Sequence, residues 1–66
     1  MKNLKKLREK RHMTQKDLAL KLGVSQGTVA RWEQEPNRYP AGEMLPRIAD
    51  LLACEIKDFF YPKKLF

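Results

Sequence analysis

Cysteine, histidine and long apolar runs are scarce in this 66-residue sequence, which contains one cysteine and one histidine. A single cysteine, Cys54, excludes an intramolecular disulfide, and no Cys/His pairs stand at the spacing of zinc ligands. No apolar run approaches the roughly 18 residues of a transmembrane helix, and the basic first segment lacks the apolar centre of a signal peptide. We therefore expect no metal site and no membrane span, and we predict a cytoplasmic protein with Cys54 as a partly buried apolar side chain.

The sequence also lacks the residue combinations that enzymes need. It has no cluster of His, Cys and carboxylate side chains and no glycine-rich phosphate loop, and the lone His12 stands in a basic turn. A chain of this length buries only about 60% of the surface that its unfolded form exposes, which leaves no room for a deep cleft between two lobes. We therefore predict a single domain over residues 1–66, with no catalytic residue, no cofactor and no small-molecule ligand.

Positive charge, in contrast, is abundant: 14 Lys and Arg residues against 8 Asp and Glu residues give a formal net charge of +6. Such an excess favours a polyanionic partner, either a nucleic acid or an anionic membrane surface. The membrane alternative depends on the basic segment MKNLKKLREKR, whose apolar face holds little more than Met1, Leu4 and Leu7. That face is too small for a helix that lies on a membrane, so a nucleic acid is the favoured partner.

Apolar residues recur at helical spacing along the chain, and no segment alternates convincingly as a strand does. Thr14 and Asp17 match a capping box, Ser25 is a good N-cap, and Pro36 must end the helix that Ser25 begins. Gly23 is placed to end the preceding helix. The sequence thus predicts an all-α fold of five short helices, over about 3–11, 14–22, 25–34 and 43–53, with a final short helix that contains Ile56, Phe59 and Phe60.

The most informative stretch is 14–34, which combines a helix, a tight glycine turn and a second helix. Ala19 is small where the two helices would cross, and Gly23 can adopt the left-handed conformation that reverses the chain. Apolar residues at matching offsets would anchor the second helix on the first: Val24, Val29 and Trp32. Together these features predict a helix-turn-helix unit.

The segment LKKLREKRHMTQKDLALKLGVSQGTVARWE closely resembles the Cro/repressor-type helix-turn-helix family, the XRE-like bacterial and phage transcription regulators. The likeness continues through EMLPRIADLL to IKDFF, and its core, TQKDLALKLGVSQGTVARWE, is specific. The resemblance implies a compact bundle of five helices of the lambda-repressor-like DNA-binding type. It also implies that the partner is double-stranded operator DNA, bound by a homodimer.

Polar residues near the start of the second helix of the unit are the predicted base contacts. A major groove admits one α-helix, whose N-terminal side chains reach the base edges. We expect Gln26 to pair with adenine, Arg31 to pair with guanine, and Thr28 to offer its hydroxyl or methyl group. Gly27 falls where members of the family often carry a base-contacting side chain, so here it can contribute only a close approach of the backbone.

Phosphate contacts are expected at the edges of the unit, because helix N-termini carry partial positive charge and free N–H groups. In the resembling family, a Gln at the position of Gln15 commonly touches the DNA backbone, and the loop after the second helix is another contact region. The predicted phosphate contacts are Thr14, Gln15, Lys16, Ser25, Asn37 and Arg38.

The resemblance also assigns Arg8 and Glu33 to a buried ion pair between the first and third helices. The chain departs from the family after this glutamate, where Glu35-Pro36 stands in place of the usual helix-capping glycine. A second departure is that Ala53 and Glu55 replace the commoner Gly and Ser/Thr. We therefore expect the third helix to end without a left-handed glycine and the last helix to be short.

These features predict a sequence-specific DNA-binding regulator that represses transcription by occupying its operator. One alternative stays open, a protein-binding adaptor or antitoxin-like module on the same fold. The tail FFYPKKLF is rich in aromatic side chains for a small monomer, and it would cover the core, form a dimer interface or dock a partner.

Overall fold

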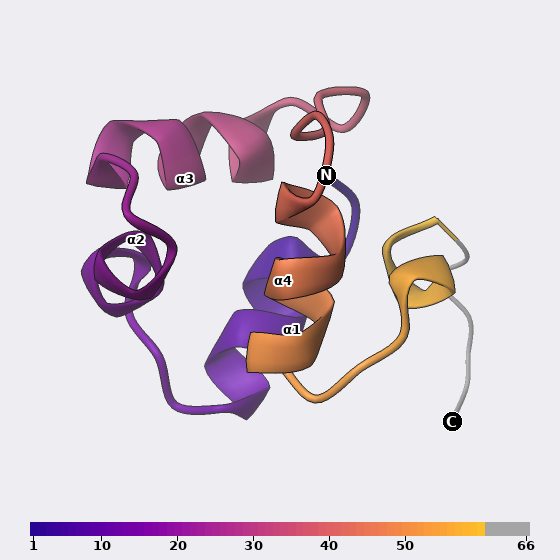
Figure 1. Cartoon of the computed structure of the whole chain (residues 1–66), viewed down its shortest axis with the longest axis horizontal. Helices are drawn as coiled ribbons and strands as arrows, with labels where there is room; N and C mark the ends of the chain where they lie inside the picture. The colour runs from indigo at the N-terminus through magenta and orange to yellow at the C-terminus, as the bar shows by residue number, and fades with distance from the viewer. Residues whose placement is uncertain (61–66) are drawn as a thin grey trace.

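The computed structural model describes residues 1–60 and consists, over that range, of α-helices and one 3₁₀ helix without a strand (Figure 1). Its elements are α1 (Leu4–Lys10), α2 (Gln15–Leu22), α3 (Gln26–Gln34), α4 (Met44–Leu51) and the 3₁₀ helix η1 (Ile56–Phe59). The predicted all-α fold is confirmed, although the fifth element is a single 3₁₀ turn and not an α-helix. The part of the tail from residue 61 onward lies outside the described residues, so its predicted roles stay predictions.

The starts of α2 and α3 follow the predicted capping patterns. The Thr14 Oγ1 accepts from the Asp17 N–H at 3.0 Å while Asp17 Oδ2 accepts from the Thr14 N–H at 3.0 Å, which is the predicted capping box. Ser25 Oγ accepts from the Thr28 N–H at 3.2 Å. Gly23 ends α2 with a φ of 75°, in the left-handed region that glycine adopts at little cost.

The hydrophobic core receives a fully buried side chain from each of the five elements: Leu4, Leu18, Val29, Ile48 and Phe59. The helix α2 packs against α3 and α4, α1 packs against α3, and η1 packs against α4. In Figure 1, α2 is seen end-on below one end of α3, and α4 lies in front of α1 in the centre of the view. Trp32 is buried on the inner side of α3, as the sequence predicts.

Two helices end earlier than the apolar spacing predicts, because the chain adopts the left-handed conformation just beyond them. After α1, His12 has a φ of 59°, and after α4, Ala53 has a φ of 53°. This conformation costs a non-glycine residue about 1–2 kcal/mol. It ends α4 at Leu51 instead of continuing the helix to residue 53.

Candidate nucleic-acid interface

The polar edge of α3 faces solvent, opposite the side that enters the core. Gln26, Gly27 and Arg31 are exposed and Thr28 is half-buried. On the other side, Val29 and Trp32 are buried. Over residues 1–60, the side chains of Gln26 and Arg31 have no hydrogen-bond partner, so both are free to contact a ligand.

At the start of α3, a predicted base contact and a predicted phosphate contact are bonded to each other. The hydroxyls of Ser25 and Thr28 lie 2.9 Å apart, in addition to the capping bond from the Thr28 N–H. A hydroxyl has one donor and two acceptor sites, so each retains capacity for a further partner. Cap formation therefore positions both hydroxyls together at the end of the helix where free N–H groups point outward.

The fold does not require glycine at position 27. A Cβ atom built on Gly27 would meet nothing closer than Ser25 Oγ at 3.9 Å, which is an ordinary contact distance. The residue lies in the first turn of α3, and within a helix glycine is less favourable than alanine by up to about 1 kcal/mol. Gly27 thus leaves one position of the polar edge of α3 without a side chain, and it lowers the stability of the helix.

A buried ionic network fixes α3 relative to α1 and α2. Arg8 Nε donates to Glu33 Oε2 at 2.7 Å and Arg8 Nη2 donates to Glu33 Oε1 at 3.3 Å, while Arg8 Nη1 donates to the Met13 carbonyl at 2.7 Å. The side chains of Arg8 and Glu33 are only 8% and 6% exposed. Gln15 Nε2 also donates to Glu33 Oε1, at 2.9 Å. One carboxylate therefore connects three helices, and each of its oxygens has a donor.

This network changes the setting of Gln15, one of the predicted phosphate contacts. Its amide nitrogen is used by Glu33, and its side chain is half-buried. The remaining predicted phosphate contacts are exposed: Thr14 and Lys16 at the start of α2, Ser25 before α3, and Asn37 and Arg38 in the following loop. The exposed candidates therefore come from three segments of the chain, and Gln15 is the one that is tied to the buried network.

The C-terminal end of α3 is held by a group that sequence reasoning missed. Glu35 ends the helix in an extended conformation, with a φ of −109°, before Pro36. The ammonium group of Met1 donates to the Trp32 carbonyl, to the Glu35 carbonyl at 2.8 Å and to the Arg38 carbonyl at 3.0 Å. A cation at a helix C-terminus interacts favourably with the helix dipole and satisfies its terminal carbonyls. The amino group therefore satisfies carbonyls at the end of α3, where the sequence has no capping glycine.

Burial opposes the charge on this amino group. Desolvation lowers the pKa of the Met1 ammonium below its ordinary value of 8.0, and the negative charges of Glu33 and Glu35 counteract part of that effect. The sequence contains only an indirect indication that the first residue is buried. Met1 shares an apolar face with Leu4, and its side chain is only 2% exposed, so the first residue is part of the core.

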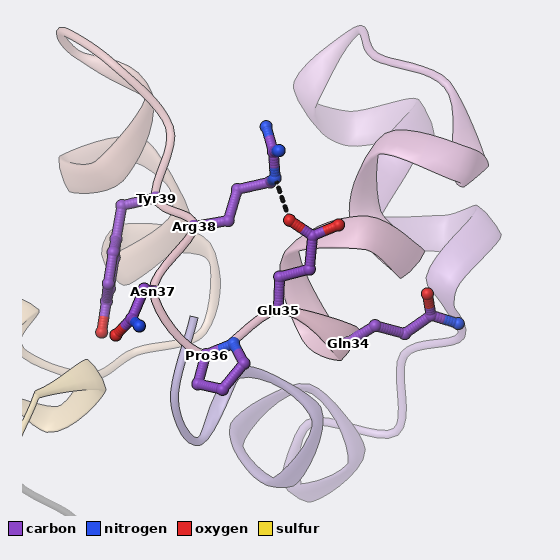
Figure 2. A pocket seen from close by; sticks show the side chains of 6 residues that line it. All are labelled: Gln34, Glu35, Pro36, Asn37, Arg38 and Tyr39. Carbon is purple, nitrogen blue, oxygen red and sulfur yellow. Dashed lines mark hydrogen bonds and ion pairs between the residues drawn. The ribbon is translucent and has the colours of Figure 1, made fainter.

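The loop after α3 contains an exposed ion pair, and it is also joined to η1 by a hydrogen bond. Figure 2 shows the carboxylate of Glu35 directed at Arg38, with Arg38 Nε 2.6 Å from Glu35 Oε1. The hydrogen bond from Arg38 lowers the pKa of Glu35, and the charges of Arg38, Arg31 and the Met1 ammonium add to this effect. Tyr39 donates from its hydroxyl to the Phe59 carbonyl at 3.2 Å, and its ring stacks on Phe60 with the centroids 4.8 Å apart.

The described residues offer little for other chemistry. Cys54 is half-buried, and burial together with the charge of Asp58 raises the pKa of its thiol to about 11, which keeps the sulfur protonated at neutral pH. Between residues 1 and 60, His, Cys, Asp and Glu form no group of three that could hold a metal ion. None of the helices in this part of the chain is long and apolar enough to cross a membrane.

In a comparison with known protein families, the model of a family described as helix-turn-helix matches residues 4–59. This span begins with α1 and ends with η1, so it includes every element described above. The corresponding searches among curated proteins and among solved structures give no match.

Proposed function

The chain belongs to the Cro/repressor-type helix-turn-helix family of DNA-binding regulators, and on that premise we propose that it binds double-stranded DNA sequence-specifically and reads the major groove with α3. The observation that carries the proposal is the edge of α3. Gln26 and Arg31 are exposed without a partner within residues 1–60, on a helix whose opposite side is fixed by the core and by the buried Arg8–Glu33 pair.

In the proposed complex, α3 enters the major groove with its N-terminal half. Gln26 forms two hydrogen bonds with an adenine, and Arg31 forms two with O6 and N7 of a guanine. Thr28 adds a hydroxyl or methyl contact, and Gly27 lets the helix backbone lie close to the base edges. The phosphate contacts are those named above, from the start of α2, the start of α3 and the loop after α3.

The regulatory consequence that we propose is repression. A domain bound at an operator excludes other proteins from that DNA by its volume alone, which requires no additional chemistry. We further propose that the chain acts as a homodimer on DNA, since two copies of a helix-turn-helix unit recognise two half-sites about one helical turn apart.

The test is binding-site selection on random duplexes, followed by measurement of the selected sequence against single-base variants. We expect Arg31→Ala to lose about 1–3 kcal/mol of discrimination at one base pair of each half-site. Arg47→Ala is the matched control, because Arg47 is an exposed arginine of α4 outside the proposed contact set. An equal loss for Arg31→Ala on every sequence would assign Arg31 to a phosphate instead of a base.

The same measurements separate DNA binding from the alternative of a protein-binding adaptor. A DNA-binding protein loses affinity steeply as salt rises, because counterions are released from the phosphates on binding. A two-fold symmetric selected sequence supports the homodimer. Absence of duplex binding even at low salt would contradict the proposed function and favour the adaptor.

A further inference from the structure

Glu35 is a carboxylate among cations at the C-terminal end of the proposed DNA-reading helix. Its side chain pairs with Arg38, three residues later, and Arg31 lies four residues earlier on α3. Its backbone carbonyl accepts from the Met1 ammonium. The carboxylate is therefore paired with the arginine that we assign to a phosphate, and in sequence it lies between that arginine and the one that we assign to a base.

Fold stability gives little reason for this ion pair. The side chains of Arg38 and Glu35 are 50% and 49% exposed, and exposed pairs contribute little because water and salt screen them. Two other hydrogen bonds hold the loop in place: the Met1 ammonium donates to the Arg38 carbonyl, and the Tyr39 hydroxyl donates to the Phe59 carbonyl. We therefore look for the role of the Glu35–Arg38 pair in the binding of DNA and not in the stability of the fold.

We propose that Glu35 attenuates DNA binding by engaging Arg38 and by placing a negative charge beside the phosphates. This inference rests on the proposed function. While the pair is intact, Arg38 Nε is occupied by Glu35, and the pair as a whole has no net charge to offer a phosphate. Glu35 thus sets the affinity for DNA below the value that the exposed arginines alone would give.

A competing effect has the opposite sign. By bonding to Arg38 Nε, Glu35 also orients the guanidinium, and loss of that orientation would weaken a phosphate contact. The orienting effect is limited by the small free energy of an exposed pair. The repulsion between Glu35 and the DNA is larger in the proposed complex, because several neighbouring phosphates act on the one carboxylate. We therefore expect attenuation to dominate.

The magnitude follows from counterion release. Each phosphate contact made by a cation contributes a slope of about −0.9 to the dependence of the logarithm of the binding constant on the logarithm of the salt concentration. One additional contact is therefore worth up to about eightfold in affinity at 0.1 M salt. Because a phosphate contact carries no sequence information, the gain should be the same on specific and unrelated duplexes.

The experiment compares Glu35→Gln with Glu9→Gln, which removes an equal charge from an exposed position of α1. Dissociation constants are measured from low to high salt on the selected duplex and on an unrelated one. At 0.1 M salt we expect Glu35→Gln to bind both about three- to eightfold more tightly, with a salt slope steeper by about one. Glu9→Gln should show a smaller gain and a nearly unchanged slope. Thermal unfolding of each variant verifies that the fold is intact.

Arg38→Gln and the double variant identify the route of the effect. We expect Arg38→Gln alone to weaken binding to both duplexes, because it removes a proposed phosphate contact and leaves the Glu35 carboxylate without its cation. We expect the double variant to bind more weakly than Glu35→Gln, because it has no released arginine. A Glu35→Gln variant that binds as tightly as the unmodified chain, or more weakly, would overturn the attenuation while leaving the proposed function intact. If the unmodified chain binds no duplex at any salt concentration, the proposed function fails and the attenuation fails with it.

Discussion

The two ends of α3 are stabilised in different ways. At its N-terminal end, Ser25 caps the helix by bonds to Thr28, three residues away in sequence. At its C-terminal end, the carbonyls are satisfied by the ammonium of Met1, and the carboxylate of Glu33 is paired with Arg8, 25 residues away. The beginning of the helix is thus a local structure, whereas its end depends on the packing of α1. A change in α1 should therefore alter the position of the polar edge of α3.

The largest expected effect comes from breaking the buried ion pair between Arg8 and Glu33. Arg8→Ala leaves the Glu33 carboxylate buried without its cationic partner, which should lower the free energy of unfolding by about 3–5 kcal/mol. That loss is a large part of the whole stability, which for a chain of this length is about 3–10 kcal/mol. Urea or thermal unfolding of the variant measures it.

Two further variants show whether the loss comes from the stranded charge. Lys10→Ala, at an exposed position of the same helix, should change the free energy of unfolding by less than about 0.5 kcal/mol. Replacing both partners, as Arg8→Met with Glu33→Leu, should recover much of the loss, because no charge is then buried alone. An Arg8→Ala variant as stable as Lys10→Ala would show that the pair contributes nothing to the C-terminal end of α3.

A smaller effect is expected when a glycine is added before Met1. The ammonium then becomes an amide with a single N–H, so the end of α3 loses charged donors to the carbonyls of Trp32, Glu35 and Arg38. We expect the free energy of unfolding to fall by about 1.5–3 kcal/mol, the usual value for hydrogen bonds to a charged group. Thermal unfolding of the 66-residue chain with and without the added glycine measures the difference.

The pH dependence reports the cost of burying the same amino group as a cation. Because burial lowers the pKa of the Met1 ammonium below 8.0, the folded chain binds fewer protons than the unfolded chain between the two pKa values. The free energy of unfolding should therefore rise as pH increases from the lowered pKa to 8.0, because burying the neutral amine costs less than burying the ammonium. The chain with the added glycine should lack this rise, and an identical rise in both chains would assign it to another group.

Much of the fold was predictable because its signals are local. The capping box at Thr14 and Asp17, the cap at Ser25 and the left-handed Gly23 each depend on side chains within four residues, and each is present in the structure. The outward position of the polar edge of α3 followed from helical spacing in the same way. Local patterns of this kind specify where a helix begins and which side faces the core.

The contacts that were not predicted join distant parts of the chain through backbone carbonyls. Arg11 donates to the Leu52 carbonyl at 3.1 Å, and the Met1 ammonium donates to carbonyls 31 to 37 residues away. A carbonyl belongs to every residue, so its partner leaves no trace in the sequence. The bond between Gln15 and Glu33 was missed for a related reason, since a polar side chain near the interface fits both a buried network and a phosphate.

The smallest expected effect lies at the N-terminal end of α3 and has the opposite sign. Gly27→Ala should raise the free energy of unfolding by about 0.5–1 kcal/mol, because alanine favours the helix and its Cβ meets only Ser25 Oγ, at 3.9 Å. If the backbone approaches the base edges here, as we propose, the added methyl group should weaken duplex binding while it stabilises the fold. Unfolding and DNA titration of one variant measure both quantities, and a joint rise in stability and affinity would show that Gly27 serves no close approach to DNA.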